Sequence, residues 1–167
     1  DDTSVVFTIS DATTIEGSEA DFTALLTDDG NDQIDIDAQN LSVSGTISVE
    51  NANLLDVATD GTITASIDTD ETVETLKTLT GTTHEYTIVI AAGDAETTTA
   101  SDLNTINGKT TGTIDASAIT VLASDNITNI KTLLTAGNDT DQFAAASFGS
   151  LTGCLLYTSP SPRDVNR

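Results

Sequence analysis

Residues 85–112 have the sequence EYTIVIAAGDAETTTASDLNTINGKTTG, and this stretch decides the fold class. Residues 86–91 form a short run rich in β-branched side chains, which is typical of a buried strand. Acidic residues and Thr over 94–99 predict a loop. Leu103 and Ile106 then follow at helical spacing. The stretch therefore predicts one short strand followed by one short helix.

This helix has its own start and stop signals. Thr99 or Ser101 can cap its first turn, because a hydroxyl oxygen accepts hydrogen bonds from the free amides there. Gly108 is placed to end the helix in the left-handed conformation. A second strand is expected directly afterwards, where alternation turns Ile114 and Ala116 inward.

The same order of strand and helix recurs with a weak period of about 26 residues. Strand centres are expected near Ile9, Ile36, Ile63, Ile88, Ile114 and Phe143. The helical positions between them are Leu26, Leu54, Leu79, Ile106 and Leu133. Residues 62–66 match 113–117, and residues 74–79 match 128–133 in the same order. We therefore predict an α/β, solenoid-like array of short parallel strands and short helices.

The chain divides into three parts in this interpretation. Residues 61–153 are the strand–helix repeats, and residues 1–60 are either an irregular first part of the array or a small β-rich unit. In that first part we expect strands at 5–10 and 33–37, a helix at 18–26, and an extra strand at 41–49. In the last helix, Ser124 is a candidate N-cap, and one apolar face carries Ile127, Ile130, Leu133 and Leu134.

The last fourteen residues, 154–167, differ in composition from the rest. Residues 1–153 contain no Cys, Pro, Arg, Met or Trp, whereas the tail holds Cys154, two Pro and two Arg. Residues 154–164, CLLYTSPSPRD, resemble the translation of an adapter oligonucleotide from transposase-based sequencing libraries. We therefore expect a non-native, disordered tail on a fragment of a longer protein, and base no disulfide, thiol or Cys–metal site on Cys154.

The formal net charge of −22 limits the classes of partner. Nucleic acid and anionic membranes both need a positive footprint, so neither is expected to bind. No apolar run approaches the roughly 20 residues of a membrane span. Divalent cations are the natural partners of such a surface. The acidic balance suits a secreted bacterial protein in salty water, where the charges are screened.

Residues 99–120, TASDLNTINGKTTGTIDASAIT, resemble repeats of very large cell-surface proteins of marine bacteria, notably picocyanobacteria. The resemblance covers about residues 61–150. It implies an extracellular or cell-surface location and an adhesin-like bulk role, in a family without an established enzymatic site. We expect neighbouring repeats of the same chain as partners, with surface polysaccharide or divalent cations as further ones.

The richest cluster of oxygen ligands is the metal-site candidate. Its members are Asp28, Asp29, Asn31, Asp32, Asp35 and Asp37. Gly30-Asn31-Asp32 and residues 137–139 each resemble half of the calcium-binding nonapeptide of toxin-type repeats. Calcium needs six to eight oxygen ligands, however, and Gly and Asn are equally typical of a solvated turn. The sequence names no other cofactor.

Catalysis has little support in the sequence. His84 is the single histidine, it is expected on an exposed loop, and nothing places a base beside a nucleophile. A row of Thr8, Thr62, Thr64 and Thr113 could match the lattice of ice or a mineral, but Asp residues interrupt it, and the ordinary preference of Thr for half-exposed strands explains it better.

We therefore expect a non-enzymatic structural or adhesive repeat segment of a large secreted or cell-surface protein. The alternatives are a calcium-binding repeat module that folds only with the ion, and a fragment of a polysaccharide-active enzyme.

Thermal unfolding of residues 1–153, followed by circular dichroism, separates the structural array from the calcium module. We expect the same cooperative melt, with mixed helix and strand signal, in chelator and in millimolar calcium. A large rise in the midpoint with calcium would instead support the calcium module and direct attention to residues 28–37.

Overall fold

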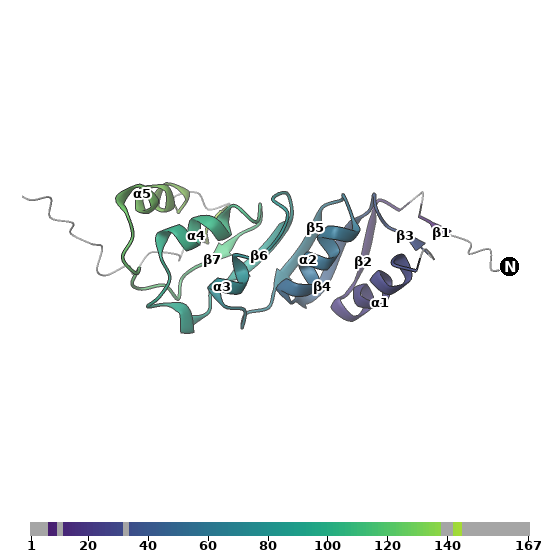
Figure 1. Ribbon diagram of the computed structural model, residues 1–167, viewed down its shortest axis with the longest axis horizontal. Helices are drawn as coiled ribbons and strands as arrows, with labels where there is room; N and C mark the ends of the chain where they lie inside the picture. Colours follow the sequence, from purple (N-terminus) through teal and green to yellow (C-terminus); the bar gives the residue numbers. More distant parts are fainter. Residues whose placement is uncertain (1–6, 10–11, 32–33, 138–141, 145–167) are drawn as a thin grey trace, which may run out of the picture.

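The computed structural model describes residues 7–9, 12–31, 34–137 and 142–144. In chain order its elements are β1 (Phe7–Thr8), β2 (Thr14–Ser18), α1 (Glu19–Asp29), β3 (Ile34–Asp35), β4 (Asn40–Ile47), α2 (Val49–Ala58), β5 (Ile63–Ile67), α3 (Val73–Leu76), β6 (Glu85–Val89), the 3-10 turn η1 (Ala92–Asp94), α4 (Ala100–Asn107), β7 (Ile114–Asp115) and α5 (Ile127–Ala136). They follow one another along the long axis of the molecule, from β1 and α1 at one end to α5 at the other (Figure 1).

One parallel sheet organises the chain. Its strand order is β2-β4-β5-β6-β7, and every pairing is parallel. An isolated parallel bridge from Ile114 to Phe143 extends it by one more position. Because β4 pairs with β5, the sheet crosses residue 60 without a break. The predicted α/β class with parallel strands is confirmed.

The spacing between paired strands is not constant. Paired residues are 26 positions apart where Ile15 meets Leu41 and where Ile88 meets Ile114. Between these pairs the separation is shorter, 22 positions from Leu41 to Ile63 and 21 from Thr64 to Glu85. A regular period of about 26 residues is therefore not shown.

The first third is built differently from the prediction. The strand expected at 33–37 is reduced to β3, which pairs with β1 in a separate two-stranded sheet. The segment expected as an extra strand is β4, which occupies the main sheet between β2 and β5. β4 rather than β3 joins the main sheet because it is eight residues long and buries Leu41, Val43 and Ile47 on one face. β2 was not predicted.

Each α-helix starts with a side-chain cap. The N-caps are Ser18, Ser48, Thr72, Thr99 and Asn126, and each side chain accepts from the backbone N–H three residues on. Thr99 rather than Ser101 caps α4, and Asn126 rather than Ser124 caps α5. Gly108 ends α4 at φ −73°, so the predicted left-handed stop is wrong there.

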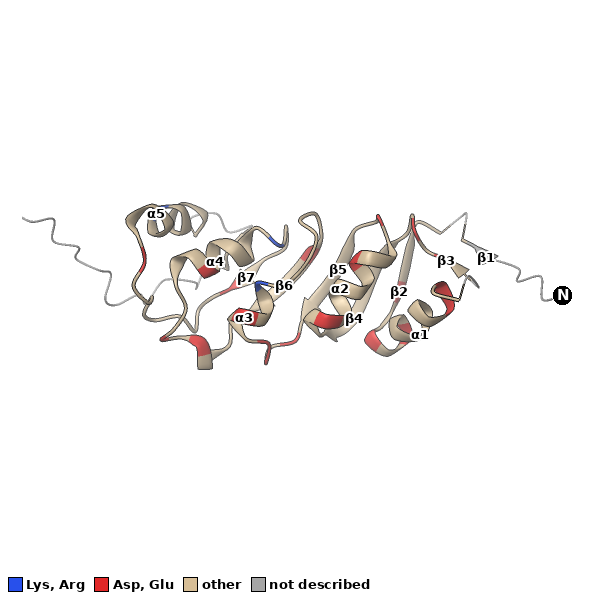
Figure 2. Ribbon diagram, in the orientation of Figure 1, with Lys and Arg blue, Asp and Glu red and all other residues tan. Residues whose placement is uncertain are grey.

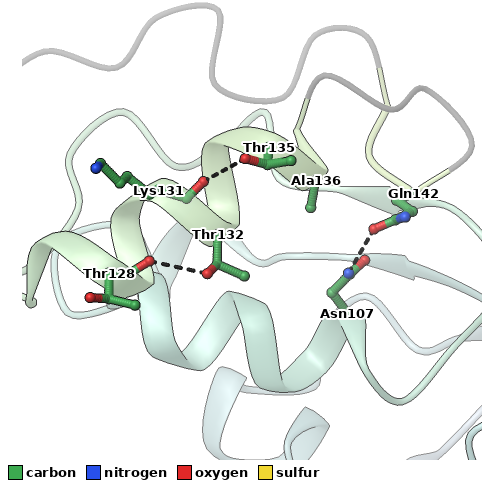
Figure 3. A pocket seen from close by; sticks show the side chains of 7 residues that line it. All are labelled: Asn107, Thr128, Lys131, Thr132, Thr135, Ala136 and Gln142. Carbon is green, nitrogen blue, oxygen red and sulfur yellow. Dashed lines mark hydrogen bonds between the residues drawn. The ribbon is translucent and has the colours of Figure 1, made fainter.

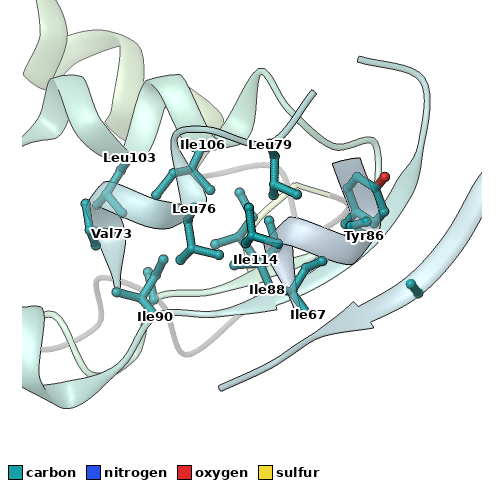
Figure 4. Packing of buried hydrophobic residues seen from close by; sticks show 14 of the residues in the cluster. Ile67, Val73, Leu76, Leu79, Tyr86, Ile88, Ile90, Leu103, Ile106 and Ile114 are labelled. Carbon is teal, nitrogen blue, oxygen red and sulfur yellow. The ribbon is translucent and has the colours of Figure 1, made fainter. Parts of the chain in front are cut away.

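Among the described residues, the helices pack on one face of the sheet. In β6, Tyr86 and Ile88 are buried while Glu85, Thr87 and Val89 are exposed. The inward side chains join those of the helices in one continuous core, which Figure 4 shows around Leu76, Ile88 and Leu103. Ile114 and Ala116 are buried, as predicted. The apolar face expected on α5 is only half buried, because Ile130 and Leu133 are covered while Ile127 and Leu134 are exposed.

Strands β5 and β7 are each preceded by a buried Thr and, two positions later, a Gly. The Oγ1 atom of Thr110 donates to the carbonyl of Tyr86 at 2.8 Å and accepts from the N–H of Gly112 at 2.8 Å. Thr59 does the same with the carbonyl of Gln39 and the N–H of Gly61. The shared sequence pattern at 59–66 and 110–117 thus has a shared structure, in which the glycine lets consecutive strands approach closely.

Gly112→Ala tests this close approach. A Cβ atom at residue 112 would lie 2.5 Å from the Tyr86 carbonyl oxygen, so backbone must shift. We expect a loss of about 1 to 3 kcal/mol in the free energy of unfolding, measured in urea. Gly93→Ala is the matched control, because a Cβ there meets nothing within 4 Å. Equal effects of the two substitutions would contradict the packing described here.

Candidate functional site

The predicted metal-site residues lie around the end of α1 and the short strand β3. Asp28 and Asp29 are the last residues of α1, Asn31 is exposed in the following turn, and Asp35 is in β3. The N–H of Asp37 donates to the Asp35 carboxylate at 3.1 Å. Asp32 lies outside the described residues.

The described residues bring no three His, Cys, Asp or Glu side chains close enough together to hold a metal ion. One of the predicted ligands, Asp32, is not among them. Calcium at residues 28–37 therefore stays a prediction, tested by the chelator experiment above.

Several carboxylates occupy the helix N-termini. Glu71 accepts from the N–H of Val49 at 2.9 Å, and Asp94 accepts from that of Val73 at 3.1 Å. Asp125 accepts from the N–H of Ser101 at 2.6 Å. In each case the carboxylate comes from a later strand–helix turn and binds the first turn of an earlier helix. These are the amides that a helix leaves without a partner, so the acidic side chains connect consecutive turns.

Glu19 makes a similar connection in the opposite direction. Its Oε1 atom accepts from the Asn51 amide at 2.7 Å and from the N–H and hydroxyl of Ser48 at 3.0 Å each. The hydrogen bond from Asn51, followed by that from the Ser48 backbone, lowers the pKa of Glu19 below its ordinary value. This carboxylate therefore joins α1 to the start of α2.

Lys77 joins α3 to α4. Its Nζ atom lies 2.7 Å from the Asp102 carboxylate and 2.6 Å from Glu74. The bond to Asp102, and then that to Glu74, raises the pKa of Lys77. Burial alone would raise the pKa of Asp102, but the hydrogen bonds from Lys77 and Thr99 lower it. In Figure 2 acidic residues mark many loops and helix ends, while lysines are few.

His84 is buried, with 3 % of its surface exposed, so the expectation of an exposed loop histidine is wrong. Its Nδ1 atom accepts from the N–H of Ile63 at 3.1 Å, and its Nε2 atom contacts the Asp56 carboxylate. An Nδ1 acceptor requires the proton on Nε2, which then donates to Asp56. Both ring nitrogens are occupied, which leaves neither for a substrate or a metal ion.

Tyr86 and Gly81 pack against the His84–Asp56 pair. Burial would raise the pKa of Asp56, but hydrogen bonds from the His84 and Thr80 side chains lower it. Burial raises the pKa of the Tyr86 phenol, whose ring lies 5.4 Å from the His84 ring. Gly81, at φ +72°, passes so close to His84 that a Cβ atom would collide with the imidazole. The cluster is therefore a packed joint between α2 and β6.

The uncovered face of the sheet presents hydroxyl and carboxylate groups. Ser42 is paired with Thr64, and Thr46 with Ser66, so hydroxyls stand beside each other across strands. Glu16 and Glu85 flank the first of these rows, paired with Ser42 and Thr64. Of the predicted Thr row, Thr64 is exposed on this face, Thr62 and Thr113 are half-buried, and the Thr8 side chain lies outside the described part.

A shallow hollow of about 540 Å³ lies beside α5. Thr128, Lys131 and Thr135 line it from α5, and Asn107 and Gln142 close it with a 2.8 Å hydrogen bond (Figure 3). The hollow holds no carboxylate and no histidine among its described lining residues, so they do not supply the acid and base of a hydrolytic site.

Comparisons with protein-family models, with curated proteins and with solved structures found no match. No helix in the described part of the chain is long and apolar enough to cross a membrane.

The pH dependence of stability tests the Lys77–Asp102 joint. Because the pKa of Asp102 is lowered in the folded chain, its ionised form stabilises the fold above the ordinary Asp pKa of about 3.9. That contribution is lost as the pH falls through the lower, folded-state value. We expect Asp102→Asn to cost about 1 kcal/mol at pH 7 and progressively less below pH 4, measured by urea unfolding.

Asp70→Asn is the control, because Asp70 is an exposed loop carboxylate. We expect it to stay within about 0.5 kcal/mol of the unsubstituted chain at every pH. A cost of Asp102→Asn that does not change with pH would contradict an ionic contribution from this pair.

Proposed function

We propose that this chain is a segment of a solenoid-like array of strand–helix turns. In this proposal it is a non-enzymatic structural or adhesive part of a large secreted or cell-surface bacterial protein. The observation that carries the proposal is the strand order of the main sheet, which follows the chain order with parallel pairing throughout. An array grows by adding one turn beside the last, and this order is the signature of that growth.

Side chains that connect consecutive turns support the same proposal. Glu71, Asp94 and Asp125 each cross from one turn to an earlier helix. Thr59 bonds back to Gln39, the residue before β4, and Thr110 bonds back to Tyr86 in β6. Bonds of this kind resist bending between turns, which is the property that a spacer needs.

The exposed sheet face suits a role in surface contact. It carries the hydroxyls of Ser42, Thr64 and Ser66 and the carboxylates of Glu16 and Glu85. Polysaccharides and divalent cations are bound by such groups, and nucleic acid is repelled by a net charge of −22. The fully engaged His84 ring supports the non-enzymatic part of the proposal.

Small-angle X-ray scattering tests the array. A compact chain of this length has a radius of gyration of about 15 Å. Extrapolated to infinite dilution, where the chain is monomeric, we expect a clearly larger radius and an asymmetric pair-distance distribution, unchanged between 20 mM and 0.5 M salt. The salt series is the control, because charge repulsion alone would expand the chain only at low salt. A symmetric distribution with a radius near 15 Å would contradict an extended array.

A further inference from the structure

The last three helices, α3, α4 and α5, are bridged at fixed positions. The N-caps of α3, α4 and α5 are Thr72, Thr99 and Asn126. Lys77, five positions after its N-cap, reaches the Asp102 carboxylate of α4 at 2.7 Å. Asn104, also five positions after its N-cap, donates to the Asn129 carbonyl of α5 at 3.0 Å. Both receiving residues lie three positions after their own N-caps.

Helix α4 has a neighbouring helix on each side, so it shows which position faces which neighbour. Asp102 contacts α3, and Asn104, two residues later, contacts α5. Two residues correspond to about 200° of helix rotation, so the two side chains lie on opposite sides. A residue five positions after the N-cap therefore faces the following helix, and one three positions after it faces the preceding helix.

Helix α5 presents the forward side of this joint. Lys131 lies five positions after the N-cap, which places it on the side away from α4. Ile127 and Leu134, four before and three after Lys131, share that stripe and are 64 % and 44 % exposed. Lys131 also lines the hollow, together with Thr128 and Thr135 (Figure 3).

Helix α1, at the other end of the molecule, presents the receiving side. Asp21 lies three positions after the N-cap Ser18, is exposed, and has its Oδ2 atom bonded to Ser18. Asp102 is bonded to Thr99 through Oδ2 in the same capping box, and its Oδ1 atom takes Lys77. No cation stands beside Asp21 among the residues that the structure describes.

We propose that a second copy of this chain docks head to tail, with α5 of one copy packed on α1 of the next. Lys131 then meets Asp21 as Lys77 meets Asp102, and Ile127 and Leu134 are covered. The argument is continuity with the α3–α4 and α4–α5 joints together with charge complementarity, and it rests on the proposed array. Because each copy carries a net charge of −22, docking strengthens with added salt.

Sedimentation velocity of the full chain tests this docking. The measurements span protein concentration at 20 mM and 0.5 M salt, with reductant present because Cys154 can cross-link two copies. We expect association that increases with concentration and with salt. We expect Lys131→Glu and Asp21→Lys each to weaken it at least about tenfold, since each places like charges at the joint.

Mixing the two variants gives the decisive result. At one joint of the mixture, the carboxylate introduced by Lys131→Glu faces the ammonium group introduced by Asp21→Lys. At the alternate joint, the unchanged Lys131 and Asp21 face each other. We expect association to return to within about threefold of that of the unsubstituted chain. Lys109→Glu and Glu50→Lys are the controls. They make the same two charge changes after α4 and in α2, outside the docking sides of α5 and α1, and should leave association unchanged.

An unsubstituted chain that stays monomeric at all concentrations and salts would overturn the proposal. Variants that fail to restore association on mixing would do the same. Thermal melts of every variant, and scattering from the dilute monomer, report on the array separately. A monomer that is extended and cooperatively folded would therefore leave the array in place and remove only the docking.

Discussion

Parallel pairing of strands in chain order is the constraint on which the rest of this structure depends. When β4, β5 and β6 run in the same direction, each connection must carry the chain back to the start of the next strand. The helices provide this return, and all of them therefore begin at the same edge of the sheet. Their unpaired N–H groups gather along that edge, where Glu71, Asp94 and Asp125 accept from them.

Some of the many acidic residues therefore stabilise the fold, because they bind the free amides at the helix N-termini. A carboxylate at a helix N-terminus is stabilised by the amides and by the helix dipole, without any bound cation. Burial would raise the pKa of Asp125, but hydrogen bonds from the Asn129 side chain and from the backbone of Asn126 and Ser101 lower it. The acidic residues that make no such bond add only repulsion, which salt screens over about 8 Å at physiological ionic strength. High net charge and an ordered fold are thus compatible.

The sequence predicts the later turns well because their signals are local. The pattern Thr-x-Gly-Thr-Ile at 59–63 and 110–114 marks the same strand entry twice, and Thr99 marks a helix start. The first third was predicted less well, because pairing decides it. Residues 33–37 and 40–47 are both β-like, and only the second has a partner on each side, β2 and β5.

The burial of His84 is a feature that the sequence prediction missed. Hydropathy alone does not identify a polar residue at an inward position. The buried positions nevertheless alternate with exposed ones here, at His84, Tyr86, Ile88 and Ile90. That period of two was present in the sequence and would have placed the imidazole inside. The contact with Asp56 could not have been found in the same way, because the two residues are 28 positions apart and meet only through tertiary packing.

The apolar stripe on α5 is wider than the part that the sheet covers. A helix that covers a sheet and nothing else needs one inward stripe, here Ile130 and Leu133. The lateral contacts of α4, which has a helix on both sides, are made instead by Asp102 and Asn104. On α5, Ile127 and Leu134 widen the apolar stripe on the side away from its described neighbour α4. Covering them gains free energy in proportion to the apolar area removed from water, which the proposed docking adds to the Lys131–Asp21 pair.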